Sequence, residues 1–309
     1  MHTKSGGKEY WKRYYSLYLM LIPGLSYVVI YKFLPLVGLT MAFQDYQIFL
    51  GDNILESMML SPFVGLDNFK RLFAYGEFAH VFSNTIIISL MKLFILFPIP
   101  IILAVLISEV PSIHYKRTLQ TVVYLPHFLS WVVVFGILST LFGSYGAVNE
   151  LLTKIGWKPI GFFSDPQVFR WTLVFSDGWK EMGWGSIIYL SAITGINSEL
   201  YEAATIDGAQ KMQQIWNITL PGILPTIAMM LALRMGGILN AGFEQILVMY
   251  NPGVYSTADI IDTFVYRVGL GKMDYSFGTA AGLFNSVIGF IMVIGGNYLS
   301  KRVTEHSIW

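Results

Sequence analysis

Long apolar stretches separated by short polar segments dominate the pattern of this chain. A helix that crosses the hydrocarbon core of a bilayer needs about 20 mostly apolar residues. By that criterion the sequence predicts about six membrane-spanning helices, near residues 17–39, 81–107, 118–142, 171–196, 220–241 and 277–299. Prolines interrupt several stretches, but neighbouring helices and ordered waters satisfy the freed backbone groups in a membrane bundle. The pattern therefore predicts an all-α integral membrane protein.

Composition supports this class and excludes others. Hydrophobic residues make up 54% of the 309 residues and charged residues only 13%, against roughly a quarter charged in soluble domains. The net charge of +1 provides no basic field for nucleic acid. Cysteine is absent, which excludes disulfides, thiolate metal sites and a cysteine nucleophile. The first apolar stretch is longer than the core of a cleavable signal peptide, so we expect it to be retained.

Basic residues predict the orientation of the spans. They cluster before the first stretch, before the third and after the sixth, at Lys4, Lys8, Lys12, Arg13, Lys116, Arg117, Lys301 and Arg302. With six spans all three clusters fall on one side, which the positive-inside rule makes cytoplasmic. We therefore expect a cytoplasmic segment 1–16, a membrane domain 17–299 and a cytoplasmic tail 300–309. Residues 244–276 and the loop between the first two stretches are net acidic, which suits the outside.

The predicted cytoplasmic loop 197–217 departs from this charge bias. It carries Glu199, Glu202 and Asp207 against only Lys211. Such an acidic loop on the cytoplasmic side requires a reason of its own.

Local signals in this loop predict a helix–turn–helix. Asn197 or Ser198 can cap a first helix. Glu199 and Glu202 would stabilise its first turns, because negative charges interact favourably with the positive N-terminal end of the helix dipole. Gly208 tolerates the left-handed conformation that ends many helices. A second short helix is expected over residues 209–218, and Pro221 suits the first turn of the fifth span because its missing N–H costs nothing there.

The loop resembles the coupling loop in the membrane subunits of binding-protein-dependent ABC importers. The family pattern is Glu-Ala-Ala, three residues, Gly, nine residues, Ile, one residue, Leu-Pro. Every spacing is met here, at Glu202, Ala203, Ala204, Gly208, Ile218, Leu220 and Pro221. Asp207 and Ala209 look like the sugar-importer branch. Residues 184–200, 250–266 and 281–302 resemble, more loosely, permeases for oligosaccharides or polysaccharide fragments.

The resemblance implies a type I ABC importer permease, similar to maltose-type permeases, in a bacterial cytoplasmic membrane. It implies a second homologous permease, two cytoplasmic ATP-binding subunits, an extracellular or periplasmic solute-binding protein and a carbohydrate substrate. The loop 197–221 would dock on an ATPase and transmit its motion. The chain has no phosphate-binding G-x-x-x-x-G-K-[ST] loop. We therefore expect it to be no enzyme, with ATP and Mg bound by the partner ATPases and no cofactor of its own.

Three charges in the fourth span are candidates for the sugar path. Asp177, Lys180 and Glu181 are spaced three and four residues apart, which places them on one helical face. Charges in a span usually face a cavity or each other, so Asp177 and Lys180 are candidates for an ion pair. Trp179 and Trp184 would offer aromatic faces to sugar C–H groups. The alternative is that the span starts later and these charges lie at the external interface.

Further polar residues at span ends are weaker candidates for the path: Asn240, Glu244, Gln245 and Asn285. Each is equally compatible with an interfacial position or a bond between helices. Lys92, in the second span, is left unassigned because its long stem can carry the amine elsewhere. His114 and His127 have no second histidine at ligand spacing, so no metal site is expected.

Two other classes of function compete with this interpretation. A secondary transporter driven by an ion gradient predicts internal repeats with broken helices at corresponding positions. No convincing repeat is present, and that class leaves the loop 197–221 unexplained. An intramembrane enzyme needs a Ser/His, His/Asp or metal-ligand constellation at membrane depth, and the histidines do not supply one.

Overall fold

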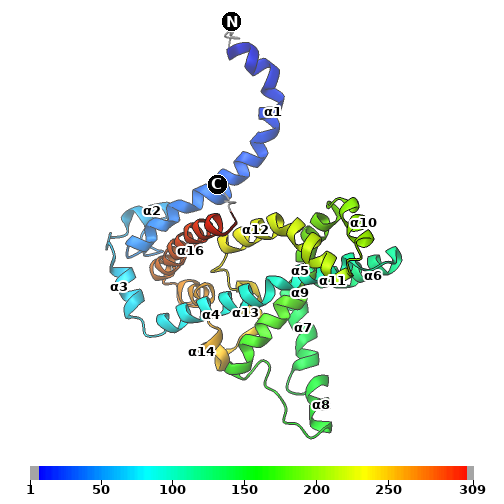
Figure 1. The fold of residues 1–309 in the computed structure, drawn as a ribbon. Coiled ribbons are helices and arrows are strands. Elements are labelled where there is room, and N and C mark those ends of the chain that lie inside the picture. The colour runs from blue at the N-terminus through cyan, green and yellow to red at the C-terminus, as the bar shows by residue number, and fades with distance from the viewer. Residues whose placement is uncertain (1–6, 305–309) are drawn as a thin grey trace. The chain divides into compact units, whose positions relative to one another are not determined.

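The computed structural model describes residues 7–304, with side chains described for residues 14–295. Within this part of the chain all regular elements are helical and no strand is formed, which confirms the all-α prediction (Figure 1). The basic side chains Lys4, Lys8, Lys12, Arg13, Lys301 and Arg302, on which the predicted orientation depends, lie outside the described side chains. So do most of the predicted segments 1–16 and 300–309.

The described chain separates into two compact units. The first comprises the described residues up to Leu72 together with Val268–Leu283. The second comprises Phe73–Arg267 and the described residues from Phe284 onward. The last helix, α16 (Tyr275–Thr304), contributes to both units.

The first unit begins with a continuous apolar helix. It consists of α1 (Gly7–Val28), a π-helical turn (Val29–Phe33) and a 3₁₀ segment (Leu34–Phe43). None of the residues in its most apolar window is buried within the chain, which leaves this surface for lipid or another subunit. The change of helix type coincides with Pro35, whose ring and missing N–H disrupt a regular α-helix. Two short helices follow, α2 (Ile54–Leu60) and α3 (Asp67–Ala74).

Within the described residues, five helical stretches are long and apolar enough to cross a membrane: Tyr14–Phe43, Phe78–Ser108, Trp131–Lys154, Lys211–Gly236 and Tyr275–Gly295. The predicted fourth span is α9 (Pro166–Thr194), a single helix of 29 residues. This helix is long enough to cross a membrane, but its charged residues make it too polar to be counted among the five apolar stretches. The helix begins earlier than predicted, and Asp177 and Glu181 lie near its middle.

The predicted third span, 118–142, is wrong as one continuous helix. The chain forms α6 (Ile113–Tyr124), a 3₁₀ turn (Leu125–Phe128) and α7 (Trp131–Phe142). Pro126 removes a backbone donor in the turn. The Ser130 hydroxyl then accepts from the Val133 N–H at 3.4 Å and caps a new helix.

The second unit is built around α9. α4 (Phe78–Leu96) and α5 (Pro98–Ser108) pack along it, together with α6 and α12 (Leu220–Gly236) (Figure 1). One apolar cluster, including Phe169 and Leu173, surrounds the first half of α9, and a second, including Tyr189 and Leu190, surrounds its last turns. Asp177, Lys180 and Glu181 of α9 lie between these two clusters.

Glycines let neighbouring helices approach the middle of α9 closely. A Cβ on Gly178 would lie 2.8 Å from the Leu96 side chain, and a Cβ on Gly183 would overlap the Val123 carbonyl oxygen. The backbones of α9 and α6 therefore touch at Gly183, and no other residue type fits there without a shift.

Short helices complete the second unit: α8 (Ala147–Lys154), α10 (Ser198–Ile206), α11 (Lys211–Gln214), α13 (Phe243–Met249), α14 (Tyr255–Ala258) and α15 (Ile261–Phe264). A 3₁₀ turn (Pro252–Val254) precedes α14 and a π-helical segment (Val265–Leu270) follows α15. Arg170 of α9 joins this region to α4, because it donates to the Thr257 carbonyl at 2.9 Å and to Asn84 Oδ1 at 2.6 Å.

Candidate functional site

The loop between α9 and α12 forms a pair of short helices, α10 and α11, called the helical pair below. Asn197 Oδ1 accepts from the Glu199 N–H at 3.0 Å and caps α10, as predicted. α10 ends at Ile206, and Gly208 has a φ of +79°, the left-handed conformation expected of a glycine at this position. The second helix begins at Lys211, two residues later than predicted, and continues through a π-helical turn (Ile215–Thr219) into α12.

Hydrogen bonds connect α10 to α11 and to the π-helical turn before α12. The Tyr201 hydroxyl lies 3.0 Å from the Thr219 hydroxyl, and Gln214 Nε2 donates to Thr205 Oγ1 at 2.9 Å. Lys211 Nζ lies 3.1 Å from Glu109, which follows α5. The helical pair is thus connected to the turn that leads into α12 and, through one ion pair, to the end of α5.

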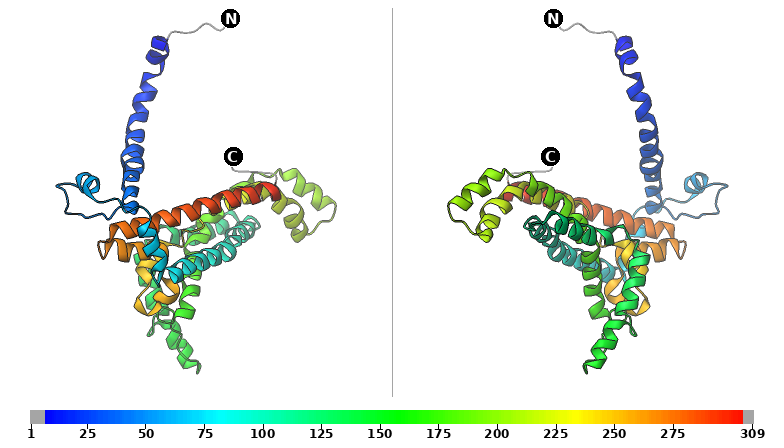
Figure 2. Two further views of the ribbon diagram at one scale, coloured as in Figure 1. Left: turned by 90° about the vertical axis from the view of Figure 1, so that its left-hand side faces the viewer. Right: turned by 90° about the vertical axis from the view of Figure 1, so that its right-hand side faces the viewer.

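The outward face of α10 is open. Glu202, Ala203, Asp207 and Gly208 are exposed, and Ile206 has a relative exposure of 86%. Of the other members of the predicted motif, Pro221 is exposed, and four are partly buried against the chain: Ala204, Ala209, Ile218 and Leu220. Figure 2 shows the helical pair projecting at one end of the second unit. This face combines small, acidic and apolar side chains, a composition suited to another protein surface.

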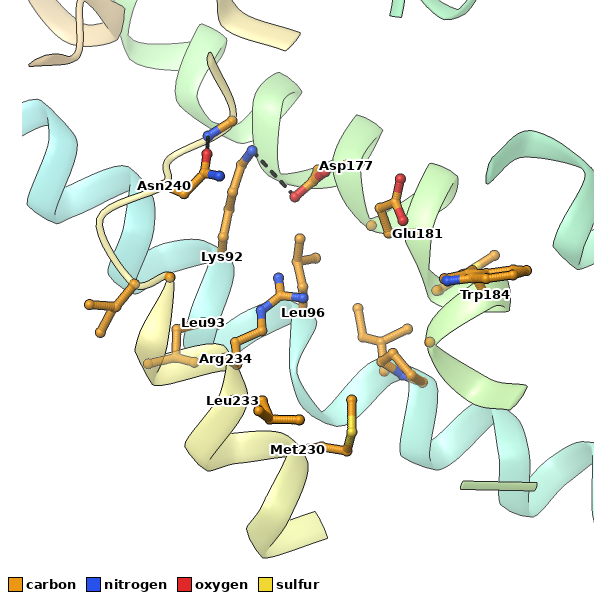
Figure 3. Close-up of a pocket in the computed structure, with 18 of the residues that line it drawn as sticks. Lys92, Leu93, Leu96, Asp177, Glu181, Trp184, Met230, Leu233, Arg234 and Asn240 are labelled. Carbon is orange, nitrogen blue, oxygen red and sulfur yellow. Dashed lines mark hydrogen bonds and ion pairs between the residues drawn. The ribbon is translucent and has the colours of Figure 1, made fainter. Parts of the chain in front are cut away.

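A cavity of about 570 Å³ lies between α4, α5, α9 and α12. Apolar side chains such as Leu96, Met230 and Leu233 form part of its wall (Figure 3). Four charged residues also line it: Lys92, Asp177, Glu181 and Arg234. This volume is in the range of small-molecule sites, which are mostly apolar with a few placed polar groups.

Lys92 is the centre of a buried network at one wall of the cavity. Its amine lies 3.3 Å from Asp177 Oδ2 and 2.5 Å from Gln245 Oε1. The Gln245 amide donates in turn to the Leu173 carbonyl and to Ser176 Oγ, both at 2.8 Å. Asp177 is thus paired with Lys92 across two helices, and the predicted pairing with Lys180 is wrong.

Lys180 and Glu181 belong to a second network. Lys180 Nζ donates to the His127 carbonyl at 2.7 Å and to Glu181 Oε1 at 3.1 Å. His127 Nδ1 lies 2.8 Å from Glu181 Oε2, and its ring stacks on Trp184 at 4.5 Å between centroids. His127 therefore fixes the indole of Trp184 at the cavity wall, a role that the sequence did not suggest.

The predicted path residues divide into two groups. Asp177, Glu181, Trp184 and Asn240 line the cavity. The remaining candidates, Trp179, Lys180, Glu244, Gln245 and Asn285, lie outside its lining. Gln245 is fully buried in the network of Lys92, and Asn285 Nδ2 lies 3.5 Å from Asp262. The assignment of any of them to a substrate path stays a prediction.

Sequence reasoning missed Arg234 and left Lys92 unassigned, although both lie on apolar spans and line the cavity. The signal was available, because a charge in an apolar span is the observation that drew attention to Asp177. Among the described residues no group of three His, Asp or Glu side chains is placed to hold a metal ion.

Comparisons with known proteins identify the family. Residues 94–305 match the model of the binding-protein-dependent transport system inner membrane component. Protein LplB of Bacillus subtilis is 42% identical over 96% of this chain and 92% of its own length. The polygalacturonan/rhamnogalacturonan transport system permease protein YteP, also of B. subtilis, is 40% identical over 95% of this chain and 90% of its own length.

A solved structure agrees over nearly the whole chain. The structure of a bacterial ABC transporter involved in the import of the acidic polysaccharide alginate matches with a TM-score of 0.87 and 42% identity. The match covers 96% of this chain and 98% of the other. A second similar structure, with a TM-score of 0.87 and 42% identity, is that of a bacterial alginate ABC transporter in complex with an alginate pentasaccharide-bound periplasmic protein. This chain therefore belongs to the family of binding-protein-dependent transport system inner membrane components and is a multi-pass permease subunit of an ABC importer.

Proposed function

We propose that the chain forms half of a translocation path for an oligosaccharide or polysaccharide fragment, and that the helical pair couples this path to a separate ATPase. The observation that carries the proposal is the rigid, outward-facing helical pair attached to the spans that enclose the cavity. Relatives at 40–42% identity that import polysaccharides support the substrate class. An ion-gradient transporter has no use for such an element.

The cavity has the chemistry that a sugar requires. Trp184 presents an indole at its wall, and aromatic faces pack well on sugar C–H groups. The Ser89 hydroxyl also lines the cavity and, within the described chain, is buried without a hydrogen-bond partner. Buried polar atoms are nearly always paired, so this hydroxyl is suited to a sugar hydroxyl or to a water that a sugar displaces.

The partners follow from the family. They are a second related permease that completes the path, two ATP-binding subunits that carry ATP and Mg and perform the hydrolysis, and a solute-binding protein outside the membrane. The chain itself binds no cofactor in this scheme. The alginate importer's complex with a periplasmic protein supports the last partner.

Reconstitution of the complete importer in proteoliposomes tests the proposal. We expect ATP-dependent uptake of an oligosaccharide delivered by the solute-binding protein, with hydrolysis stimulated by the loaded protein. Uptake driven by an ion gradient without ATP would contradict the proposal. A panel of neutral and acidic oligosaccharides identifies the substrate.

We further propose that both termini and the helical pair face the cytoplasm. The natural absence of cysteine makes the test direct. A cysteine in place of Met212, which is exposed on α11, should resist an impermeant thiol reagent in intact cells. A cysteine in place of Lys158, exposed between α8 and α9, should react. The reverse labelling pattern would invert the topology.

A further inference from the structure

The charges around the cavity leave one cation unmatched. Lys92 is paired with Asp177, and Glu181 is paired with Lys180. Arg234, from the last turn of α12, is the remaining charge on the cavity wall. Among the described residues no side chain forms a hydrogen bond or ion pair with its guanidinium. The groups at the cavity wall and their ion-pair partners therefore carry one net positive charge.

The position of Arg234 makes this charge available to a ligand. The side chain extends from α12 toward the cavity, with Asp177 and Glu181 on the facing helix α9 (Figure 3). The residue is exposed and lines the cavity, so its side chain is accessible to a ligand. Neither carboxylate on α9 is free to satisfy it, because each already has a lysine partner at 3.3 Å or less.

The surroundings favour a carboxylate as the missing partner. A guanidinium presents parallel N–H donors that match the two oxygens of a carboxylate, and such charge-assisted pairs are stronger than neutral hydrogen bonds. The low-dielectric apolar wall strengthens the attraction further. Ser89 and Asn240 line the same cavity and offer uncharged polar groups, and Trp184 offers an aromatic face.

We infer that the cavity takes a saccharide that carries a carboxylate, such as a hexuronic acid unit, and that Arg234 binds this carboxylate. The inference rests on the proposed function and specifies its substrate class. Ser89 and Asn240 would contact sugar hydroxyls, and Trp184 would stack on an uncharged part of the sugar. A neutral saccharide would leave the guanidinium unpaired and would therefore bind more weakly.

Direct binding to the purified permease–ATPase complex in nanodiscs tests the inference without the selectivity of the solute-binding protein. The probes are short hexuronic acid oligosaccharides and the same oligosaccharides after reduction of their carboxylates to alcohols. We expect the native complex to bind the acidic form about tenfold tighter or more, as for hydrogen bonds to charged groups. Arg234→Gln should abolish this preference. Arg234→Lys, which keeps the positive charge but lacks the parallel N–H donors of the guanidinium, should retain part of it.

Lys158→Gln is the matched control, because it removes the same charge from an exposed position outside the cavity. It should bind both forms as the native complex does. Equal affinity of the native complex for both forms, or no binding of either, would overturn the inference. So would an equal loss of both forms in Arg234→Gln, which would assign Arg234 to a contact with the second permease. Failure of the proposed function is a separate result, namely no ATP-dependent uptake of any saccharide by the reconstituted importer.

Discussion

The helical pair and the cavity are both polar interruptions of an apolar chain, but they are assembled in opposite ways. The helical pair is contiguous, since its caps, turn and internal hydrogen bonds all come from residues 197–219. The cavity draws its charges from α4, α9 and α12, which are far apart in the sequence. Local sequence therefore determines the helical pair, and tertiary packing determines the cavity.

Because of this difference, substitutions in the two regions should have different effects. A change in the helical pair has few internal neighbours to disturb, so its effect should appear at the surface that α10 presents. A change in the cavity breaks bonds between helices, so its effect should appear in stability as well as in transport. The predictions below separate these two outcomes.

The largest effect is expected from Gly208→Val. A Cβ on Gly208 would meet no described atom within 4 Å apart from its chain neighbours, so the main cost within the chain is the left-handed backbone, about 1–2 kcal/mol. If α10 docks on an ATPase, the added side chain enters that contact. We expect the complex to insert normally and to lose ATPase binding or stimulated hydrolysis, measured by pull-down and by hydrolysis in proteoliposomes.

Gly156→Val is the matched control for this backbone strain. Gly156 has a φ of +82°, and a side chain there also meets nothing within 4 Å, but it lies in the loop after α8. It should retain transport. Equal losses in the two variants would mean that strain, and not docking, explains the defect, and would contradict the assignment of the helical pair.

The next effect is expected at the buried pair of Lys92 and Asp177. Lys92→Met leaves a carboxylate unpaired at the cavity wall, and Asp177→Leu leaves a buried ammonium, so each single change should cost on the order of 3 kcal/mol. The double variant removes both charges and should recover most of this loss. Thermal unfolding of the purified complex measures the cycle, and additive losses would show that the two residues act independently.

The sequence predicted the helical pair almost completely. Its cap at Asn197, its glycine turn at Gly208 and its position before α12 were all expected, because capping and turn preferences depend on neighbouring residues. Its first helix was also placed correctly. The π-helical turn Ile215–Thr219 was not expected, and nothing in the local sequence distinguishes it from an α-helix.

The cavity was predicted only in part. Helical spacing predicted that Asp177 and Glu181 share one face of the fourth span, but spacing along one helix cannot show which helix lies opposite. That is why Asp177 was paired with Lys180 in the prediction, although Lys92 of α4 is its partner. The break at Pro126 was also missed. Many membrane helices contain prolines, so a proline by itself did not predict that the helix would end there.

A smaller, pH-dependent effect is expected at Asp262 in α15, outside the candidate spans. Burial raises the pKa of its carboxyl above the usual value. The folded state therefore disfavours the ionised carboxylate. This destabilisation is fully present above the pKa of the folded state and disappears as the pH falls below the pKa of the unfolded state. Asp262→Asn should raise the melting temperature near neutral pH, and the gain should shrink on acidification. A gain independent of pH would exclude this cause.

The smallest effect is expected from Lys211→Ala, although Lys211 connects the helical pair to the end of α5. Its amine lies 3.1 Å from Glu109, but the Lys211 side chain is 76% exposed and the Glu109 side chain 31% exposed. Solvent and salt screen such pairs, which typically contribute about 0–1 kcal/mol. The bonds of Tyr201 to Thr219 and of Gln214 to Thr205 remain in place and hold α10 on their own. We therefore expect stimulated ATP hydrolysis within about twofold of the native importer, with any deficit shrinking further at high salt. A loss as large as that of Gly208→Val would mean that this ion pair, and not the two partly buried hydrogen bonds, transmits the motion of the helical pair to the spans.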